Sequence, residues 1–215
     1  MTDAPFQAFG ELRRFARRPA PAEHCELCGA AVADEHEHMV EVEKRRLLCA
    51  CQACAILFGA QAGQRYKRVP SRVLSLSGFR LTDAQWNSLL IPINMAFFCR
   101  SSATGQVTAV YPSPAGATES LLALEAWFQI VKENPQLETM EPDVEALLVN
   151  RLGAARGFPV NRYFLLPIDQ CFKLVGLVRT HWRGLSGGEE LWQALEVYFA
   201  ALGARARVIG VSQHA

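Results

Sequence analysis

Two cysteine pairs near the N-terminus constrain this chain more than any other feature. The first pair is Cys25 and Cys28, followed by Gly29, and the second pair is Cys51 and Cys54. Two thiolates three positions apart can hold one ion if the chain turns tightly, and a glycine after the second permits that turn. Two such pairs, separated by about twenty residues, are typical of a zinc site. The sequence therefore predicts a Cys-rich metal-binding module over residues 23–60.

The residues between and after the pairs predict the fold of this module. Residues 38–43 alternate as a strand, residues 46–49 return as a second strand, and residues 55–58 begin an apolar helix. A knuckle, a hairpin and a helix that starts at the second pair follow the order of a treble-clef or zinc-ribbon-like module. A helix N-terminus suits thiolates because its free N–H groups stabilise anionic sulfur.

The segment holds more potential ligands than one tetrahedral ion needs. Cys49 can replace Cys51, since the two lie on the same side of an extended chain. His36 and His38 also share one face; they bind a second ion, complete an open site, hydrogen-bond the thiolates, or are exposed residues of a strand edge. The predicted ligands are Cys25, Cys28, Cys51 and Cys54, with Cys49, His36 and His38 in reserve.

The sulfur-rich ligand set limits the choice of metal. Tetrahedral thiolates favour zinc or iron. An iron site of the rubredoxin type normally has a glycine after both cysteine pairs, whereas Ala55 follows Cys54 here. The predicted cofactor is therefore zinc, and iron or an iron–sulfur cluster is the alternative.

Composition and cysteine placement bear on the compartment and on the class of partner. A formal net charge of +1 gives no global electrostatic reason to bind nucleic acid or an anionic membrane. No apolar run reaches the ~20 residues that a spanning helix needs. Clustered cysteines favour a metal over disulfides. Residues 1–22 carry four arginines but no apolar export core. We expect a flexible basic lead-in and a cytoplasmic protein.

Residues 61–215 mix helical and strand patterns. Thr82 and Gln85 have the spacing of a capping box at a helix start. Helical apolar spacing and strand-like runs alternate along the rest of this range, which predicts an α+β body with a small, largely antiparallel sheet. Cys171 lies on an apolar helical stripe and Cys99 at a strand end, and we expect both to be buried as small hydrophobic residues. Helices are expected within 121–131, 168–175 and 191–202, and strands within 93–99, 107–111, 144–149 and 163–166.

One further group of residues suggests a binding surface. Cations, an imidazole and an indole meet at Arg179, His181, Trp182 and Arg183. Such a group can recognise a carboxylate, a phosphate or a partner surface; the alternative is a packed Trp182 with solvated arginines. The sequence has no nucleophile–base pair or paired-carboxylate motif, so it gives no positive evidence for an enzyme and does not exclude one.

Two long motifs resemble a known group of sequences. They are CELCG…HEHMVEV…RRLLCACQACAILF and LPIDQCFKLVGLVRTHWRGLSGGEELW. They resemble a bacterial family of uncharacterised function that is associated with gene neighbourhoods of actinobacterial-type nickel–iron hydrogenases. The resemblance extends over roughly residues 22–205. It implies a partner context, which is the assembly, maturation or electron supply of a hydrogenase, and it implies no catalytic residues.

These observations support three functional hypotheses in order of preference. The first is a zinc-binding accessory protein that assists a nickel–iron hydrogenase by protein–protein contact. The second is an iron-containing electron-transfer partner of the hydrogenase. The third is a nucleic-acid-binding protein that uses the treble clef. It ranks last because acidic residues across 34–43 offset the basic run 44–46, which is unfavourable for contact with phosphates.

Overall fold

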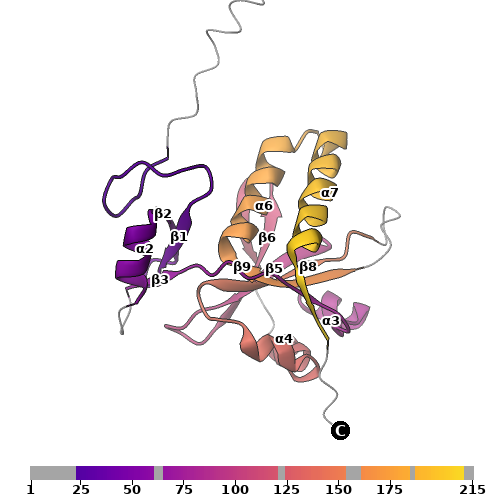
Figure 1. Cartoon of the computed structure of the whole chain (residues 1–215). Helices are drawn as coiled ribbons and strands as arrows, with labels where there is room; N and C mark the ends of the chain where they lie inside the picture. Colours follow the sequence, from indigo (N-terminus) through magenta and orange to yellow (C-terminus); the bar gives the residue numbers. More distant parts are fainter. Residues whose placement is uncertain (1–22, 61–64, 121–123, 154–160, 185–186, 211–215) are drawn as a thin grey trace, which may run out of the picture.

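The computed structural model describes residues 23–60, 65–120, 124–153, 161–184 and 187–210. The predicted basic lead-in, residues 1–22, lies outside the described residues. A small N-terminal module lies beside a larger body of sheet and helices (Figure 1).

The module contains a three-stranded antiparallel sheet in the order β2-β1-β3. Its strands are β1 (Glu37–Glu41), β2 (Arg46–Ala50) and β3 (Tyr66–Arg68), and helix α2 (Gln52–Gly59) follows β2 directly. The predicted order of knuckle, hairpin and helix is thus observed. Strand β3 pairs with β1 although it follows residue 60, where the sequence predicted the body to begin.

The body contains a seven-stranded sheet in the order β10-β4-β9-β8-β5-β6-β7. All pairings are antiparallel except β10 with β4, which confirms a largely antiparallel sheet. The prediction of a small sheet is wrong. The strands are β4 (Leu74–Leu76), β5 (Met95–Arg100), β6 (Val107–Ser113), β7 (Gly116–Ser120), β8 (Glu145–Asn150), β9 (Arg162–Pro167) and β10 (Arg207–Ile209).

The missed strands explain this error. Strands β4 and β10 have three residues each, and β7 is made of small and polar residues. Such segments carry almost no periodic apolar signal. They become strands because neighbouring strands offer their unpaired backbone groups, which must find partners.

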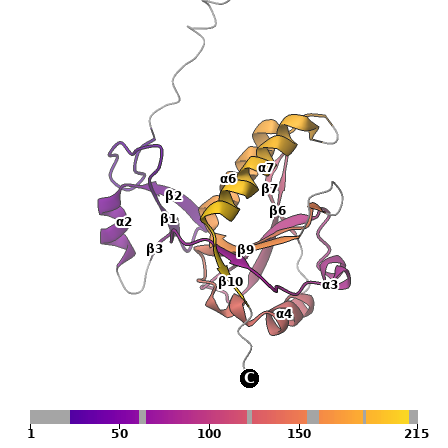
Figure 2. The same ribbon diagram turned by 45° about the vertical axis from the view of Figure 1, so that its right-hand side comes forward.

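Helices cover both faces of the large sheet (Figure 2). On one face the core includes Phe97 and Leu148 together with residues of α6 (Ile168–His181) and α7 (Gly188–Arg205). On the other face Phe98 and Leu147 pack with α3 (Asp83–Ser88), α4 (Leu124–Glu133) and the short 3-10 helix η1 (Pro135–Thr139). Adjacent strand residues therefore enter opposite cores, which explains why the central strands are continuously apolar.

Two local predictions about helices can be checked directly. The capping box at the start of α3 is confirmed, because the Thr82 side chain accepts from the Gln85 N–H and the Gln85 side chain reaches back to the Thr82 N–H. No helix of the described ranges has both the length and the apolar character needed to cross a membrane.

The β1–β2 hairpin joins the module to the body. Val40 and Leu47 pack into the core beneath α6 and α7, whereas Met39 and Ala50 belong to the apolar cluster around the cysteines. One face of the hairpin thus supports the cysteine pairs and the opposite face meets the body. A salt bridge of 2.7 Å from Lys67 Nζ of β3 to the Asp143 carboxylate adds a second attachment.

Candidate metal centre

The four paired cysteines converge on one point. The sulfur atoms of Cys25, Cys28, Cys51 and Cys54 all lie within 4.8 Å of one another. The Cys28 and Cys51 sulfur atoms are 3.7 Å apart. Two thiolates on a tetrahedral ion with Zn–S bonds of about 2.3 Å lie about 3.8 Å apart. The arrangement therefore fits one tetrahedral metal ion.

The first pair is shaped by a tight backbone turn. The Cys25 N–H donates to the Ala30 carbonyl at 2.8 Å, and the Gly29 N–H donates to the Cys25 carbonyl at 2.8 Å. Gly29 has φ +77°, a left-handed conformation that residues with a Cβ rarely adopt. This turn brings the two sulfur atoms of the first pair to the same side of the chain.

The second pair uses a helix start. Cys51 is the N-cap of α2, and its sulfur accepts a hydrogen bond from the Cys54 N–H at 3.5 Å. Cys54 is the third residue of the helix. An N-cap side chain usually accepts from the backbone N–H three positions later, and this is the spacing of Cys51 and Cys54. The helix thereby presents both sulfur atoms and a positive dipole end to the same point.

The electrostatics of the cluster favour a bound cation. Burial alone would raise the pKa of the Cys25 thiol, but hydrogen bonds from the backbone of Cys51, Leu27 and Cys28 lower it to about 6. Burial raises the pKa of the Cys54 thiol to about 12. Without a cation the cluster therefore holds some of its sulfurs as thiols, since like charges at this separation repel one another. A divalent metal removes that repulsion and releases the remaining protons.

The reserve ligands form a second, separate group. The ligand atoms of His36, His38 and Cys49 lie within 4.8 Å of one another. Burial, followed by the negative charges of Glu23 and Glu26, raises the pKa of the Cys49 thiol. Of the two arrangements left open by the sequence, the structure groups Cys51 with the other paired cysteines and places Cys49 with the histidines.

The predicted binding surface lies at the C-terminal end of α6. Its polar groups mostly satisfy local backbone atoms: His181 Nδ1 contacts the Leu177 carbonyl at 3.1 Å, and the Trp182 indole donates to the Gly184 carbonyl at 2.8 Å. Arg183 donates to two carbonyls at the end of the helix, and Arg179 is exposed. The role of this surface in binding stays a prediction.

The two isolated cysteines lie in the body. Cys171 lies on the buried face of α6 and is completely buried, and burial raises the pKa of its thiol well above the ordinary value. Cys99 is half-buried in β5, and its sulfur lies 3.9 Å from the Thr108 carbonyl. Cys171 therefore packs as a small hydrophobic residue, as predicted, and Cys99 is less enclosed than expected.

Comparison with known proteins places the chain in a family. The sequence profile described as "Family of unknown function (DUF5947)" matches residues 24–206, which is most of the chain. The chain belongs to the DUF5947 family. No curated protein and no solved structure matches it. The matched DUF5947 range contains both cysteine groups and nearly all of the described sheet and helices, so the metal centre and the body belong to one family unit.

Sequence reasoning missed the acidic residues around the second group, which are Glu23, Glu26 and Asp169. The Oδ2 atom of Asp169, in α6, lies 3.2 Å from His38 Nδ1. Nothing in the local pattern around Asp169 points to the distant His38; the acid is an ordinary first-turn residue of a helix. Only the packing of the hairpin against α6 brings the two together.

Proposed function

We propose that this DUF5947 protein is a zinc-binding accessory protein that acts by protein–protein contact in the assembly, maturation or support of a nickel–iron hydrogenase. The observation that supports the metal-binding role is the convergence of four cysteine sulfurs, with 3.7 Å between those of Cys28 and Cys51. Four protein thiolates fill a tetrahedral ion and leave no open position, which is the arrangement of a structural site.

The proposed partner rests on sequence resemblance and on the exposed end of α6. The motifs around both cysteine pairs and along α6 resemble sequences that occur beside hydrogenase genes. The second motif includes Arg179 and Arg183, both exposed cations at the predicted binding surface. Arginines at such positions suit contact with carboxylates on a protein partner.

The metal assignment is tested by elemental analysis and a visible spectrum of protein purified without oxygen. We expect zinc and no visible colour. Cys25→Ser and Cys28→Ser should each lose one zinc per chain relative to the wild type and lower the unfolding temperature, because a structural zinc contributes directly to folding. Cys171→Ser, outside both cysteine groups, is the control and should keep its metal. Unchanged metal content in the Cys25→Ser protein would contradict the site.

An iron-containing electron-transfer partner is the second candidate, favoured by one observation. Cys28 is exposed, so one ligand of the cluster reaches the protein surface, where electrons can pass to a partner. Iron with visible thiolate-to-iron absorption, in place of colourless zinc, would establish this candidate and overturn the structural role.

The partner assignment needs a separate binding experiment. Purified nickel–iron hydrogenase and hydrogenase assembly proteins would be titrated with the full chain in a calorimeter. We expect one of them to bind, and Arg179→Glu to weaken that binding at least tenfold through the loss of a charged contact. Lys173→Glu, an exposed charge reversal on the same helix, should bind as the wild type does. Absence of binding to every hydrogenase component, or a salt-sensitive complex with DNA instead, would overturn the proposal.

A further inference from the structure

The hairpin register gathers three metal-binding side chains on one face. His38 in β1 lies directly opposite Cys49 in β2, and residues opposite each other in an antiparallel pair point to the same face. His36 lies two positions before His38, and its ring centroid is 4.7 Å from that of His38. Because Val40 and Leu47 on the same face pack into the body, this group lies on the side of the hairpin that faces the body.

Each imidazole is oriented by a hydrogen bond at Nδ1. His36 Nδ1 lies 2.8 Å from the Ala33 carbonyl, which can only accept, so Nδ1 carries the proton. His38 Nδ1 lies 3.2 Å from the Asp169 carboxylate, which also accepts. In the neutral rings these contacts leave the Nε2 lone pairs free. Histidines that ligate metals are usually held in this way, by a carbonyl or a carboxylate at the other ring nitrogen.

The Nε2 atom of His36 is a buried polar atom that lacks a partner. The side chain is only 6% exposed, and Nε2 has no hydrogen-bond partner among the residues that the structure describes. An unpaired buried polar atom is unfavourable, because it has lost its hydrogen bonds to water and gained no partner in return. A metal ion at this point would provide the missing partner.

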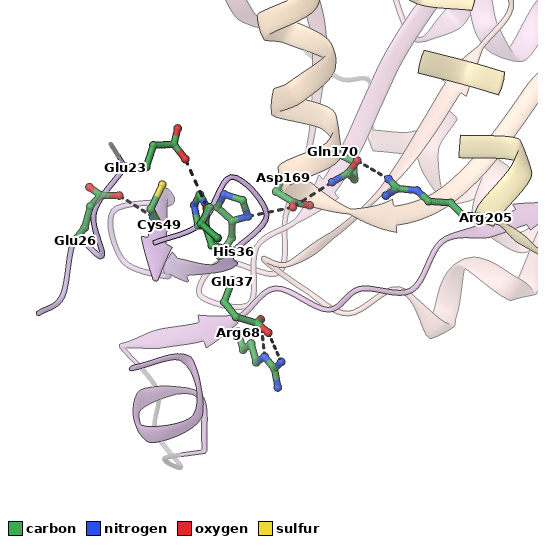
Figure 3. Close-up of polar contacts among 11 residues, drawn as sticks. Glu23, Glu26, His36, Glu37, Cys49, Arg68, Asp169, Gln170 and Arg205 are labelled. Atoms are coloured by element: carbon green, nitrogen blue, oxygen red, sulfur yellow. Dashed lines mark hydrogen bonds and ion pairs between the residues drawn. The ribbon is translucent and has the colours of Figure 1, made fainter. Parts of the chain in front are cut away.

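Carboxylates surround the group on several sides (Figure 3). Glu23 lies 3.5 Å from His36, and Glu26 accepts the Cys49 N–H at 2.8 Å. Together with Asp169 they place negative charge around neutral ligands, which favours a cation.

We propose that His36 Nε2, His38 Nε2 and Cys49 Sγ bind a second divalent transition-metal ion, separate from the ion of the four cysteines. Two imidazoles and a thiolate select zinc, cobalt or nickel over magnesium and calcium. Binding releases the Cys49 proton to solvent. Three protein ligands leave a fourth position for water or for a side chain of a partner, which makes this ion exchangeable, unlike one enclosed by four thiolates.

The second site also joins the module to the body. Beyond His38, Asp169 contacts Gln170 at 3.2 Å, and Gln170 accepts from Arg205 at the end of α7 at 2.5 Å (Figure 3). This polar chain extends from the hairpin through the start of α6 to α7. Occupancy of the site therefore strengthens the attachment of the hairpin to α6, independently of any partner.

The test is a titration of the metal-free, full-length chain with Co²⁺, followed by thiolate-to-cobalt absorption and elemental analysis. We expect two cobalt ions per wild-type chain and one in Cys49→Ser and in His38→Ala. The matched controls are Cys99→Ser and His24→Ala, which should keep both ions. Cys28→Ser should lose the four-cysteine ion and keep the second, which separates failure of one site from failure of the other. Equal cobalt content in the wild type and in Cys49→Ser would overturn the second site.

Two further measurements do not depend on variants that remove a ligand. Asp169→Asn should weaken the second ion about 10- to 100-fold, because it removes the carboxylate that orients His38, and should leave the four-cysteine ion unchanged. In the wild type, nitrogen NMR of the side chains should show the Nε2 resonances of two histidines shifting when a second equivalent of Zn²⁺ is added. Absence of that shift in the folded wild type would overturn the proposal even if every variant misfolds.

Discussion

At the scale of single residues, Gly29 shows how one backbone conformation shapes the metal centre. Its φ is +77°, and a Cβ at this position would meet no atom within 4 Å. The effect of Gly29→Ala is therefore purely conformational, about 1–2 kcal/mol of lost stability. Urea unfolding of the zinc-loaded protein measures it. Gly203→Ala, in α7 with equally open space and no positive φ, should stabilise the protein by about 0.5–1 kcal/mol. A change of the same sign in the free energy of unfolding of both variants would contradict the role of the positive φ at Gly29.

Leu90 provides a second prediction at this scale, with the opposite sign. Leu90 follows α3 and has φ +56°, a left-handed conformation that is strained for a residue with a Cβ. Its side chain is 72% exposed, so packing contributes little to offset that strain. Leu90→Gly should raise the free energy of unfolding by about 0.5–1 kcal/mol, because glycine is the usual residue at a left-handed helix end. Leu90→Asn should give a smaller gain. A lower urea midpoint for Leu90→Gly would show that the side chain packs more than its exposure indicates.

At the scale of elements, Asn134 connects the end of α4 to the loop before α3. Its side chain is fully buried, donates to the Ile130 and Arg80 carbonyls at 2.8 Å each, and accepts from the Arg80 N–H at 2.7 Å. Asn134→Ala removes all three hydrogen bonds and leaves the buried Ile130 carbonyl without this partner, so it should lower the free energy of unfolding by about 2–3 kcal/mol. Asn87→Ala, exposed on α3, is the control and should change it by about 0.5 kcal/mol at most. Equal effects of the two would contradict the buried network.

At the scale of the whole molecule, Asp143 anchors the module to the large sheet. It accepts from Lys67 of β3 at 2.7 Å and from the Ser102 N–H at 2.8 Å. Burial alone would raise the pKa of Asp143, but these hydrogen bonds lower it below the ordinary value. The resulting stability is fully present above the unfolded pKa, about 3.9, and is lost as pH falls through the lower folded pKa.

Asp143→Asn should therefore destabilise the protein by about 1.5–3 kcal/mol at neutral pH, since it removes a charged hydrogen-bond acceptor. Asparagine tolerates the φ of +73° at this position, so backbone strain does not contribute. The difference from the wild type should shrink below about pH 4, as the wild-type carboxylate becomes protonated. Urea unfolding from neutral pH to below about pH 4 measures this difference in the free energy of unfolding. The exposed Asp34→Asn variant is the control. A difference that stays constant with pH would exclude the ion pair as its cause.

The sequence by itself determined the features that depend on near neighbours. The spacing of Cys25 and Cys28 before Gly29, and of Cys51 and Cys54 at a helix start, already specifies a knuckle and an N-cap, because both are built from hydrogen bonds within a few residues. The capping box at Thr82 was predictable for the same reason, and the central strands were predictable from their apolar runs. The wider sheet was not, since β4, β7 and β10 carry almost no periodic signal of their own.

The tertiary structure alone decided how the extra ligands are divided. Cys49 and Cys51 lie on the same side of an extended chain, so the sequence does not distinguish them as ligands. The hairpin register pairs Cys49 with His38, and Cys51 is left to cap α2. The packing of α6 against the hairpin then brings Asp169 to His38. These relations join residues far apart along the chain. They depend on which surfaces bury together, and local periodicity does not encode that choice.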